Sequence, residues 1–228
     1  MRVAALYDVH GNLPALEAVL AEVEDVDAIV LGGDMVLGPF PAATLARLRE
    51  LEGTHWIRGN CERGMVEQDE LDPEFGWHLR WCADQLGTEA TAELAALPEE
   101  VALDVDGLGR VLFVHATPRS DRERITRLTP EDDLREALDG VDADVVVCGH
   151  THVQFDHGVG ETRLVNAGSV GWPWEDERGA YWALLGPDVE LRQVDYDRRA
   201  AYEEFKRTDW YASDRGNFLV ENLLKPPT

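Results

Sequence analysis

The sequence predicts an α/β fold in which two packed mixed β-sheets lie between outer helices, as a four-layer α-β-β-α sandwich. Strand-like and helix-like runs alternate through the first half of the 228 residues. Short strand-like runs separated by turns dominate the second half, and no linker interrupts the chain. We therefore expect a single domain over residues 1–228.

The first half has the pattern of a β-α-β-α-β unit. Three apolar runs are short enough for buried strands: RVAALY (2–7), DAIVL (27–31) and THWI (54–57). Two intervening runs place apolar side chains at helical spacing: NLPALEAVLAEVE (12–24) and PAATLARLREL (41–51). Asn12 is expected to cap the first helix, with Pro14 in its first turn. Strands joined by helices in this way run parallel.

Residues 61–97 have a helical and loop-like pattern, which predicts a helical insertion or lid. A strand pair around a glycine turn (100–107 and 109–114), a helix (130–140) and a strand (143–147) follow. The remaining strand-like runs look antiparallel: HVQFDHG (152–158), TRLVNAG (162–168), AYWALLG (180–186) and VELRQVD (189–195). A helix over 198–206 and a polar tail are expected to close the chain.

The charge of the chain limits its partners. Forty-five acidic residues against 21 basic ones give a net charge of −24, and Lys206 and Lys225 are the only lysines. Such a surface repels polyanions, so we expect no long nucleic acid as a partner, and a DNA nuclease is disfavoured. The acidic excess is also typical of a high-salt cytoplasm or a GC-rich genome, and composition does not separate these origins.

Hydropathy and cysteine content favour a cytoplasmic protein. No stretch approaches the roughly 18 to 20 apolar residues of a membrane span, so no membrane association is expected. The chain begins almost directly with a strand, which leaves no room for a signal peptide. Cys61, Cys82 and Cys148 are odd in number and irregularly spaced, which argues against a disulfide framework.

Five of the apolar runs end in side chains that can bind a metal. In chain order these are Asp8 and His10, then Asp34, Asn60, His115, and finally His150 and His152. Any one cluster could be a simple turn, because Asp, Asn and Gly favour turns. Five clusters with the same placement instead predict a site at the carboxyl ends of the strands, where open α/β sheets bind their ligands.

The seven donors suffice for two ions if one carboxylate bridges them. Imidazole and carboxylate together favour Mn, Fe, Co, Ni or Zn over Ca or Mg. No thiolate is required, so the set does not describe a structural cysteine-type zinc site. We expect two divalent transition-metal ions, with manganese as the first choice and iron, nickel, cobalt or zinc as alternatives. Paired ions of this kind activate water and stabilise in-line displacement at phosphorus.

These motifs, taken in order, resemble those of the calcineurin-like metallophosphoesterase superfamily. They are D-x-H (8–10), G-D (33–34), G-N-x-E (59–62), a lone His115 and G-H-x-H (149–152). The sequence is most similar to the small prokaryotic phosphodiesterase branch, in which DxHGN opens the chain and GNC replaces GNH. The resemblance spans Asp8 to about Gly171, including NAGSVG (166–171).

The resemblance implies a ligand set, a reaction and a substrate class. One ion would be held by Asp8, His10, Asp34 and His152, and the second by Asp34, Asn60, His115 and His150, with Asp34 as the bridge. A metal-bridging hydroxide would attack phosphorus in a small phosphorylated substrate, such as a phosphodiester or a nucleotide. Asn60 would belong to the catalytic group as well as to the ligands. Arg58 and Arg119 would hold the non-bridging oxygens, unless they form surface or structural salt bridges.

Cys61 departs from the family pattern. Much of the superfamily has a histidine here, which acts as a general acid. A thiol with an ordinary pKa of about 8.5 is less suited than an imidazole to protonating a leaving group at neutral pH. We expect either a preference for good leaving groups, with Cys61 as a weak acid, or a Cys61 that merely lines the cleft.

Several other interpretations remain open. The enzyme alternatives are a diadenosine-tetraphosphatase-like nucleotide hydrolase and a phosphoprotein phosphatase, and the non-enzyme alternative is a metal-free interaction scaffold. His55, His78 and His157 lie outside the motifs and are expected to be surface or packing residues. Trp172 and Trp174 could stack on an aromatic group of a substrate or could pack their loop against the body of the protein.

Overall fold

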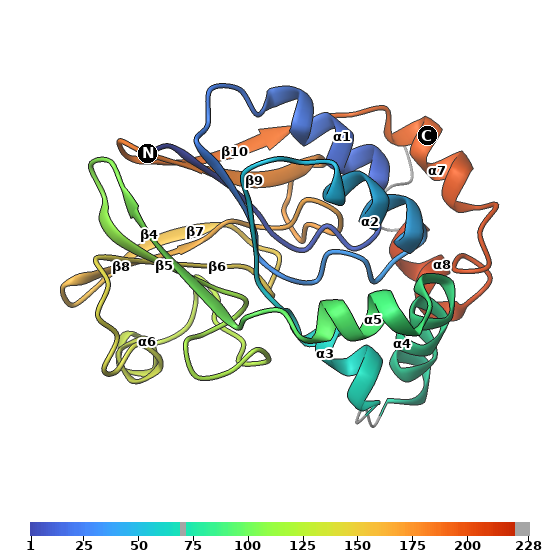
Figure 1. Ribbon diagram of the computed structural model, residues 1–228, viewed down its shortest axis with the longest axis horizontal. Coiled ribbons are helices and arrows are strands. Elements are labelled where there is room, and N and C mark those ends of the chain that lie inside the picture. Colours follow the sequence, from blue (N-terminus) through green and yellow to red (C-terminus); the bar gives the residue numbers. More distant parts are fainter. Residues whose placement is uncertain (69–71, 222–228) are drawn as a thin grey trace.

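Two five-stranded β-sheets pack face to face in the computed structural model, which describes residues 1–68 and 72–221 (Figure 1). The first sheet has the order β10-β9-β1-β2-β3. Its strands are β1 (Val3–Leu6), β2 (Ala28–Leu31), β3 (Thr54–Trp56), β9 (Ala180–Leu185) and β10 (Val189–Val194). Strands β1, β2 and β3 run parallel, as the β-α-β-α-β pattern predicts, and β9 joins β1 antiparallel.

The second sheet has the order β4-β5-β6-β8-β7. Its strands are β4 (Glu100–Val105), β5 (Gly109–Val114), β6 (Val145–Cys148), β7 (Phe155–Val159) and β8 (Thr162–Asn166). The pairs β7–β8 and β9–β10 are antiparallel, as expected. However, β8, one of the runs that looked antiparallel in the sequence, also runs parallel to β6, and the sheet is mixed as predicted. The reason is that β7 crosses to the edge of the sheet and the hairpin returns β8 beside β6.

Helices cover the outer faces of both sheets. Helices α1 (Leu13–Glu22) and α2 (Pro41–Arg49) pack on the first sheet, and α6 (Glu131–Ala137) packs on the second. Asn12 caps α1 as predicted, because its side chain accepts a hydrogen bond from the Ala15 amide at 3.2 Å. This arrangement confirms the four-layer α-β-β-α sandwich.

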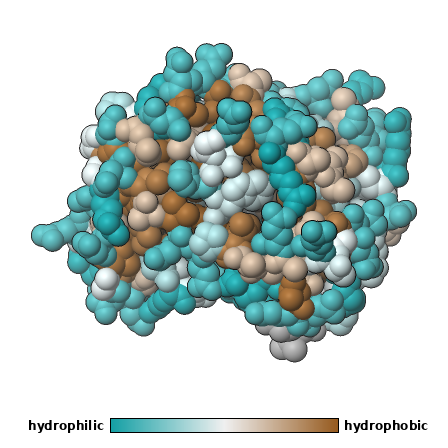
Figure 2. Space-filling model, viewed as in Figure 1, coloured by the Kyte–Doolittle hydropathy of each residue, from teal (hydrophilic) through white to brown (hydrophobic). Residues whose placement is uncertain are grey.

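Alternating side chains along the strands build three apolar layers. In β1, Ala4 and Leu6 face the helices, whereas Val3 and Ala5 face the other sheet. A third apolar cluster lies between the second sheet and α6, and it includes Leu134. Hydrophilic side chains cover much of the outer surface in the view of Figure 2. The central strands β1, β2 and β6 are therefore buried on both faces. This burial holds their carboxyl ends, where the polar motifs begin, in fixed positions.

Residues 61–97 are helical, as predicted. They form most of α3 (Asn60–Glu67), α4 (Pro73–Leu86) and α5 (Thr88–Ala95), which lie together at one end of the sandwich (Figure 1). Residues 69–71 of the expected insertion lie outside the described part.

After α7 (Arg198–Phe205), the chain was expected to continue as a polar tail. Instead, α8 (Asp214–Leu219) follows, with Trp210 and Val220 buried on either side of it. Residues 222–228 of that tail lie outside the described part. Among the described residues, no helix combines the length and apolarity required to cross a membrane.

Candidate metal centre

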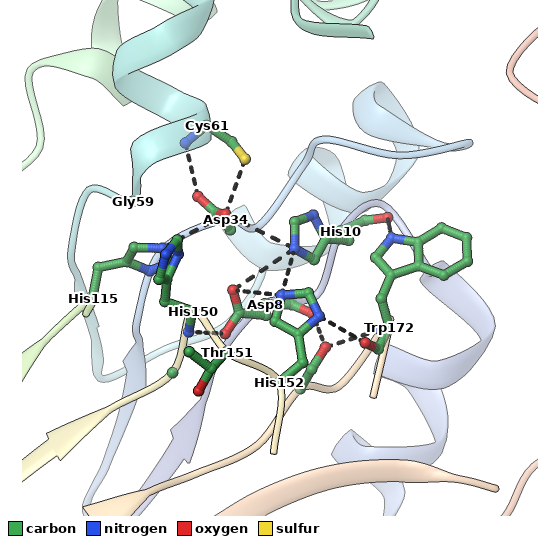
Figure 3. A network of polar contacts seen from close by, with 12 residues as sticks. Asp8, His10, Asp34, Gly59, Cys61, His115, His150, Thr151, His152 and Trp172 are labelled. Atoms are coloured by element: carbon green, nitrogen blue, oxygen red, sulfur yellow. Dashed lines mark hydrogen bonds and ion pairs between the residues drawn. The ribbon is translucent and has the colours of Figure 1, made fainter. Parts of the chain in front are cut away.

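All seven predicted metal ligands come together at one edge of the two sheets. They follow the carboxyl ends of β1, β2, β3, β5 and β6, and Figure 3 shows six of them in one cluster. The seventh, Asn60, joins the cluster because its Oδ1 lies 3.1 Å from Nε2 of His115. Three groups of possible ligand atoms are compact among the described residues: Asp8 with His10 and His152, Asp34 with His115 and His150, and His10 with Asp34 and Cys61. The first two groups each contain residues of one of the two ion sites that the resemblance implies, and the assignment of ions to them stays a prediction.

The backbone turns sharply at most of these ligands. Seven described residues other than glycine have a positive φ angle, and five of the seven are predicted metal ligands: Asp8, His10, Asp34, His150 and His152, with φ between 48° and 62°. Residues other than glycine rarely adopt this left-handed conformation, and it persists where the surrounding structure enforces it, often at functional sites. The strain therefore marks this edge as a functional site.

Backbone carbonyls fix the tautomers of three histidines. In each, Nδ1 lies within hydrogen-bonding distance of a carbonyl oxygen: His10 with Leu37 at 3.1 Å, His115 with Gly32 at 2.9 Å, and His152 with Trp172 at 2.7 Å. A carbonyl oxygen only accepts hydrogen bonds, so each Nδ1 carries a proton. In the neutral ring, the lone pair is then on Nε2, which points into the cluster. Such a hydrogen bond from the ring nitrogen that does not bind the metal is typical of metal-binding histidines.

The Nε2 atoms and carboxylates face one another at short range. His10 Nε2 and His152 Nε2 are 3.2 Å apart, and they lie 3.7 Å and 3.3 Å from Oδ1 of Asp8. This Oδ1 atom is buried and has no hydrogen-bond partner among the described residues. Lone pairs that converge on one point around an unsatisfied buried carboxylate oxygen are unfavourable unless a positive charge lies between them. The donor set therefore fits a cation.

The pKa values of His10 and Asp8 support the same conclusion. Burial, with the nearby His152, lowers the pKa of His10 to about 4, so His10 is neutral at pH 7 and able to bind a metal. Burial alone would raise the pKa of Asp8, but the neighbouring His152 lowers it well below the usual range. Asp8 is therefore an ionised carboxylate, and protons compete with a cation for this site.

Cys61 and Asp34 form a hydrogen-bonded unit. The amide of Cys61 donates to Oδ1 of Asp34 at 2.9 Å, and its thiol donates to Oδ2 at 2.9 Å (Figure 3). Burial and the adjacent Asp34 raise the pKa of the thiol, so it stays protonated and can donate this bond. The side chain of Cys61 therefore lines the site with its proton directed at the expected bridging carboxylate.

Glu62 is a buried residue to which the sequence analysis assigned no role. Its carboxylate accepts three backbone hydrogen bonds, from the amides of Asp34 at 2.8 Å, Met35 at 2.8 Å and Gly59 at 2.9 Å. Burial and the nearby Asp34 raise the pKa of Glu62 to about 7, although the backbone hydrogen bonds act in the opposite direction. Glu62 thus ties the loop after β2 to the start of α3. The glutamate of G-N-x-E, three residues into a helix start, is the available sequence signal.

Arg58 and Arg119 reach the rim of the site but are engaged by carboxylates. Both line a cleft of about 600 Å³ that includes His115. Arg58 pairs with Glu99, and Arg119 pairs with Glu123 at 2.6 Å and with Glu136 at 3.1 Å. These contacts correspond to the structural salt bridges named as their alternative role.

The tryptophan loop packs on the site. The indole of Trp172 is buried and donates a hydrogen bond to the His10 carbonyl at 3.2 Å. Trp174 is 46% exposed. His78 is a packing residue as expected, since it is buried and its ring nitrogens contact the Glu74 carbonyl and the Ser213 hydroxyl.

Comparisons with known proteins agree with this fold. An uncharacterized protein of Methanocaldococcus jannaschii is 27% identical, with 89% of this chain and 90% of that protein covered. The crystal structure of a metallophosphoesterase from Sphaerobacter thermophilus has a TM-score of 0.75 at 25% identity. The match covers 96% of this chain and 98% of that protein's chain. A hypothetical protein from Pyrococcus horikoshii has a TM-score of 0.79 at 21% identity, with 90% and 92% covered, and so shares the fold.

The model of the calcineurin-like phosphoesterase superfamily domain matches residues 1–186, which include every predicted metal ligand and all strands except β10. The chain therefore belongs to the calcineurin-like phosphoesterase superfamily.

Proposed function

We propose that this protein is a metal-dependent phosphodiesterase that acts on small substrates. One divalent ion would be held by Asp8, His10, Asp34 and His152, and a second by Asp34, Asn60, His115 and His150. The observation that carries the proposal is the set of Nε2 lone pairs held against two buried carboxylates by backbone carbonyls. Manganese is our first choice of metal.

The roles of the chain's own residues follow from their contacts. When bound, two such ions lower the pKa of a water and neutralise charge at phosphorus. Asp34 would be held in its bridging orientation by Cys61, whose amide and thiol each donate to one carboxylate oxygen. Asp8 is fixed by the His150 amide, which donates to its Oδ2 at 2.8 Å. The protein thus contributes preorganisation, which is the main requirement for phosphoryl transfer.

Charge around the cleft favours a diester over a monoester. Arg58, Arg63 and Arg119 line it, but so do four acidic residues, Glu67, Glu99, Glu100 and Asp121. A diester carries one negative charge, whereas a monoester or a polyphosphate carries more and needs more cationic contacts. Helix α3 supplies Arg63 and Glu67, so we assign the helices of residues 61–97 to the substrate side of the site.

Solved structures with this fold include a phosphodiesterase and a protein of the diadenosine-tetraphosphatase class, which is one of the two enzyme alternatives. An archaeal phosphodiesterase has a TM-score of 0.51 at 17% identity, and a putative diadenosine tetraphosphatase has a TM-score of 0.55 at 18% identity. At these identities they share the fold alone. The charge of the cleft is therefore our reason for preferring the phosphodiesterase.

The test is to remove metal with a chelator, restore Mn²⁺, and compare hydrolysis of bis(4-nitrophenyl) phosphate with that of 4-nitrophenyl phosphate. We expect the diester to be hydrolysed faster, and only after Mn²⁺ is restored. Asp34→Ala should lose both ions in a metal analysis and nearly all activity. Faster monoester hydrolysis would contradict the diester assignment, and a fully active Asp34→Ala variant would overturn the two-ion site.

A further inference from the structure

A small aromatic hollow adjoins the metal centre on the side away from His115. Its volume is about 80 Å³, and its inner end is formed by His10 and His152. Phe75, Trp172, Trp174 and Trp210 contribute its walls. In Figure 3, His115 and Trp172 lie at opposite ends of the ligand cluster, so the arginine cleft and this hollow flank the metal centre on different sides.

The inner walls of the hollow are held in place by contacts between distant segments. Trp172 and Trp210 are each 2% exposed. The ring of His78 on α4 lies 4.2 Å from the Trp210 ring, and its Nε2 lies 2.8 Å from the Ser213 hydroxyl, which caps α8. These contacts join α4 to α8 beside the metal centre, so the hollow is preformed.

The mouth of the hollow is apolar and bordered by acids. Trp174 and Leu219 also line an outer depression of about 310 Å³, together with Phe218, Glu74 and Asp214. Trp174 and Phe218 are 46% and 54% exposed, and they are two of the few large hydrophobic side chains that the described residues expose. Exposed apolar side chains grouped beside a site are typical of ligand-binding surfaces.

We propose that this hollow is a binding subsite for a flat, uncharged aromatic ring of the substrate, either an aryl group or a nucleobase. The proposal rests on the proposed function, because the phosphate would lie at the ligands that form the inner end of the hollow. Aromatic walls favour a ring by stacking and burial. Glu74 and Asp214 at the mouth would repel a further phosphate, so a polyphosphate chain is disfavoured on this side.

Paired ligands that differ only in the ring test the subsite by calorimetry on the manganese-loaded protein. Phenylphosphonate is compared with methylphosphonate, and adenosine 5′-phosphate with ribose 5-phosphate. We expect the ring to tighten binding about tenfold in at least one pair, from stacking and burial together. A gain in the first pair identifies an aryl subsite and a gain in the second a nucleobase subsite, whereas a gain in neither overturns the proposal.

Trp174→Ala should reduce that gain to about twofold or less. The variant keeps the hydrogen bond from Trp174 to the His152 carbonyl at 3.0 Å, because that bond uses backbone atoms. Trp77→Ala is the matched control, since Trp77 is an exposed tryptophan of α4 that does not line the hollow. An undiminished gain in Trp174→Ala would overturn the subsite. Nitrophenyl ester hydrolysis is measured separately, so a failed subsite with intact hydrolysis is distinguishable from a failed phosphodiesterase.

Discussion

The thiol of Cys61 lies 2.9 Å from Oδ2 of Asp34, the carboxylate shared by two of the three possible ligand groups. The position that carries a general-acid histidine in much of the superfamily therefore holds a donor that faces a predicted metal ligand. Because burial and Asp34 raise the pKa of this thiol, it keeps the proton with which it donates to Asp34 at neutral pH. This geometry favours a positioning role for Cys61 over proton donation to a leaving group.

Cys61→Ala should weaken metal binding about tenfold, because Asp34 would keep the amide hydrogen bond to Oδ1 but lose the thiol hydrogen bond to Oδ2. Cys61→Ser should retain most of the affinity, since a hydroxyl can donate in the same direction. Titration of the metal-free protein with Mn²⁺ measures both. Cys82→Ala is the control, as Cys82 is equally buried but contacts the Gly38 carbonyl instead of a ligand. Equal affinities in all variants would make Cys61 a spectator.

Glu62→Ala should lower the free energy of unfolding by at least about 3 kcal/mol, because three buried amides would lose their acceptor. Glu62→Gln should have a smaller effect, since one oxygen remains to accept. Urea unfolding of the metal-free proteins measures both changes. Glu67→Ala is the control on the same helix. The Glu67 side chain is half exposed, so its removal should lower the free energy of unfolding by less than about 1 kcal/mol. If Glu62→Ala lowers the free energy of unfolding by less than about 1 kcal/mol, Glu62 does not stabilise the link between the loop after β2 and the start of α3.

The strands, and the gathering of the predicted ligands at their ends, were predictable from sequence because their signals are local. A short apolar run followed by Asp8 and His10 predicts both a buried strand and the polar side chains at its carboxyl end. The tautomers of the histidines were not predictable. The acceptor for His115 Nδ1 is the Gly32 carbonyl, 83 residues away, and only the folded chain brings them together.

Features that depend on contacts between distant segments were not predictable from the sequence. The pairing of β8 with β6 depends on where the β7–β8 hairpin docks, which no local pattern encodes. Helix α8 lies in a polar stretch and is anchored by the isolated residues Trp210 and Val220, which make no helical repeat. The pairing of Arg119 with Glu136 was equally hidden, since Glu136 is 17 residues away and on α6.

The contribution of Asp121 to stability should depend on pH. Burial alone would raise the pKa of Asp121, but the hydrogen bonds from Arg63, at 2.7 Å and 3.1 Å, lower it below its usual value. A carboxyl whose folded-state pKa is lowered stabilises the fold above its unfolded pKa, about 3.9, and loses that contribution as the pH falls through the folded value. The difference in unfolding free energy between wild type and Asp121→Asn should therefore shrink when the pH is lowered from 6 to 3.

Urea unfolding at several pH values measures this difference. Glu67→Gln is a suitable control, because Glu67 also pairs with Arg63 but from a half-exposed position. A difference for Asp121→Asn that stays constant or grows towards pH 3 would contradict the assigned direction of the pKa shift.

Added salt should stabilise the fold. A net charge of −24 produces self-repulsion that is larger in the compact state than in the unfolded chain. Raising KCl from about 0.1 M to 1 M shortens the screening length from about 10 Å to 3 Å, which weakens this repulsion more than it weakens the short surface ion pairs. The melting temperature should therefore rise with KCl.

A charge variant separates screening from other effects of salt. Glu52 and Glu161 are exposed, and replacing both with lysine changes the net charge from −24 to −20, since each replacement adds two charges. At low salt this variant should melt at a higher temperature than wild type. Its melting temperature should also rise less than that of wild type when KCl is added. If it gains as much as wild type, screening of self-repulsion is not the cause. If KCl lowers the melting temperature of both, the surface ion pairs contribute more than the repulsion.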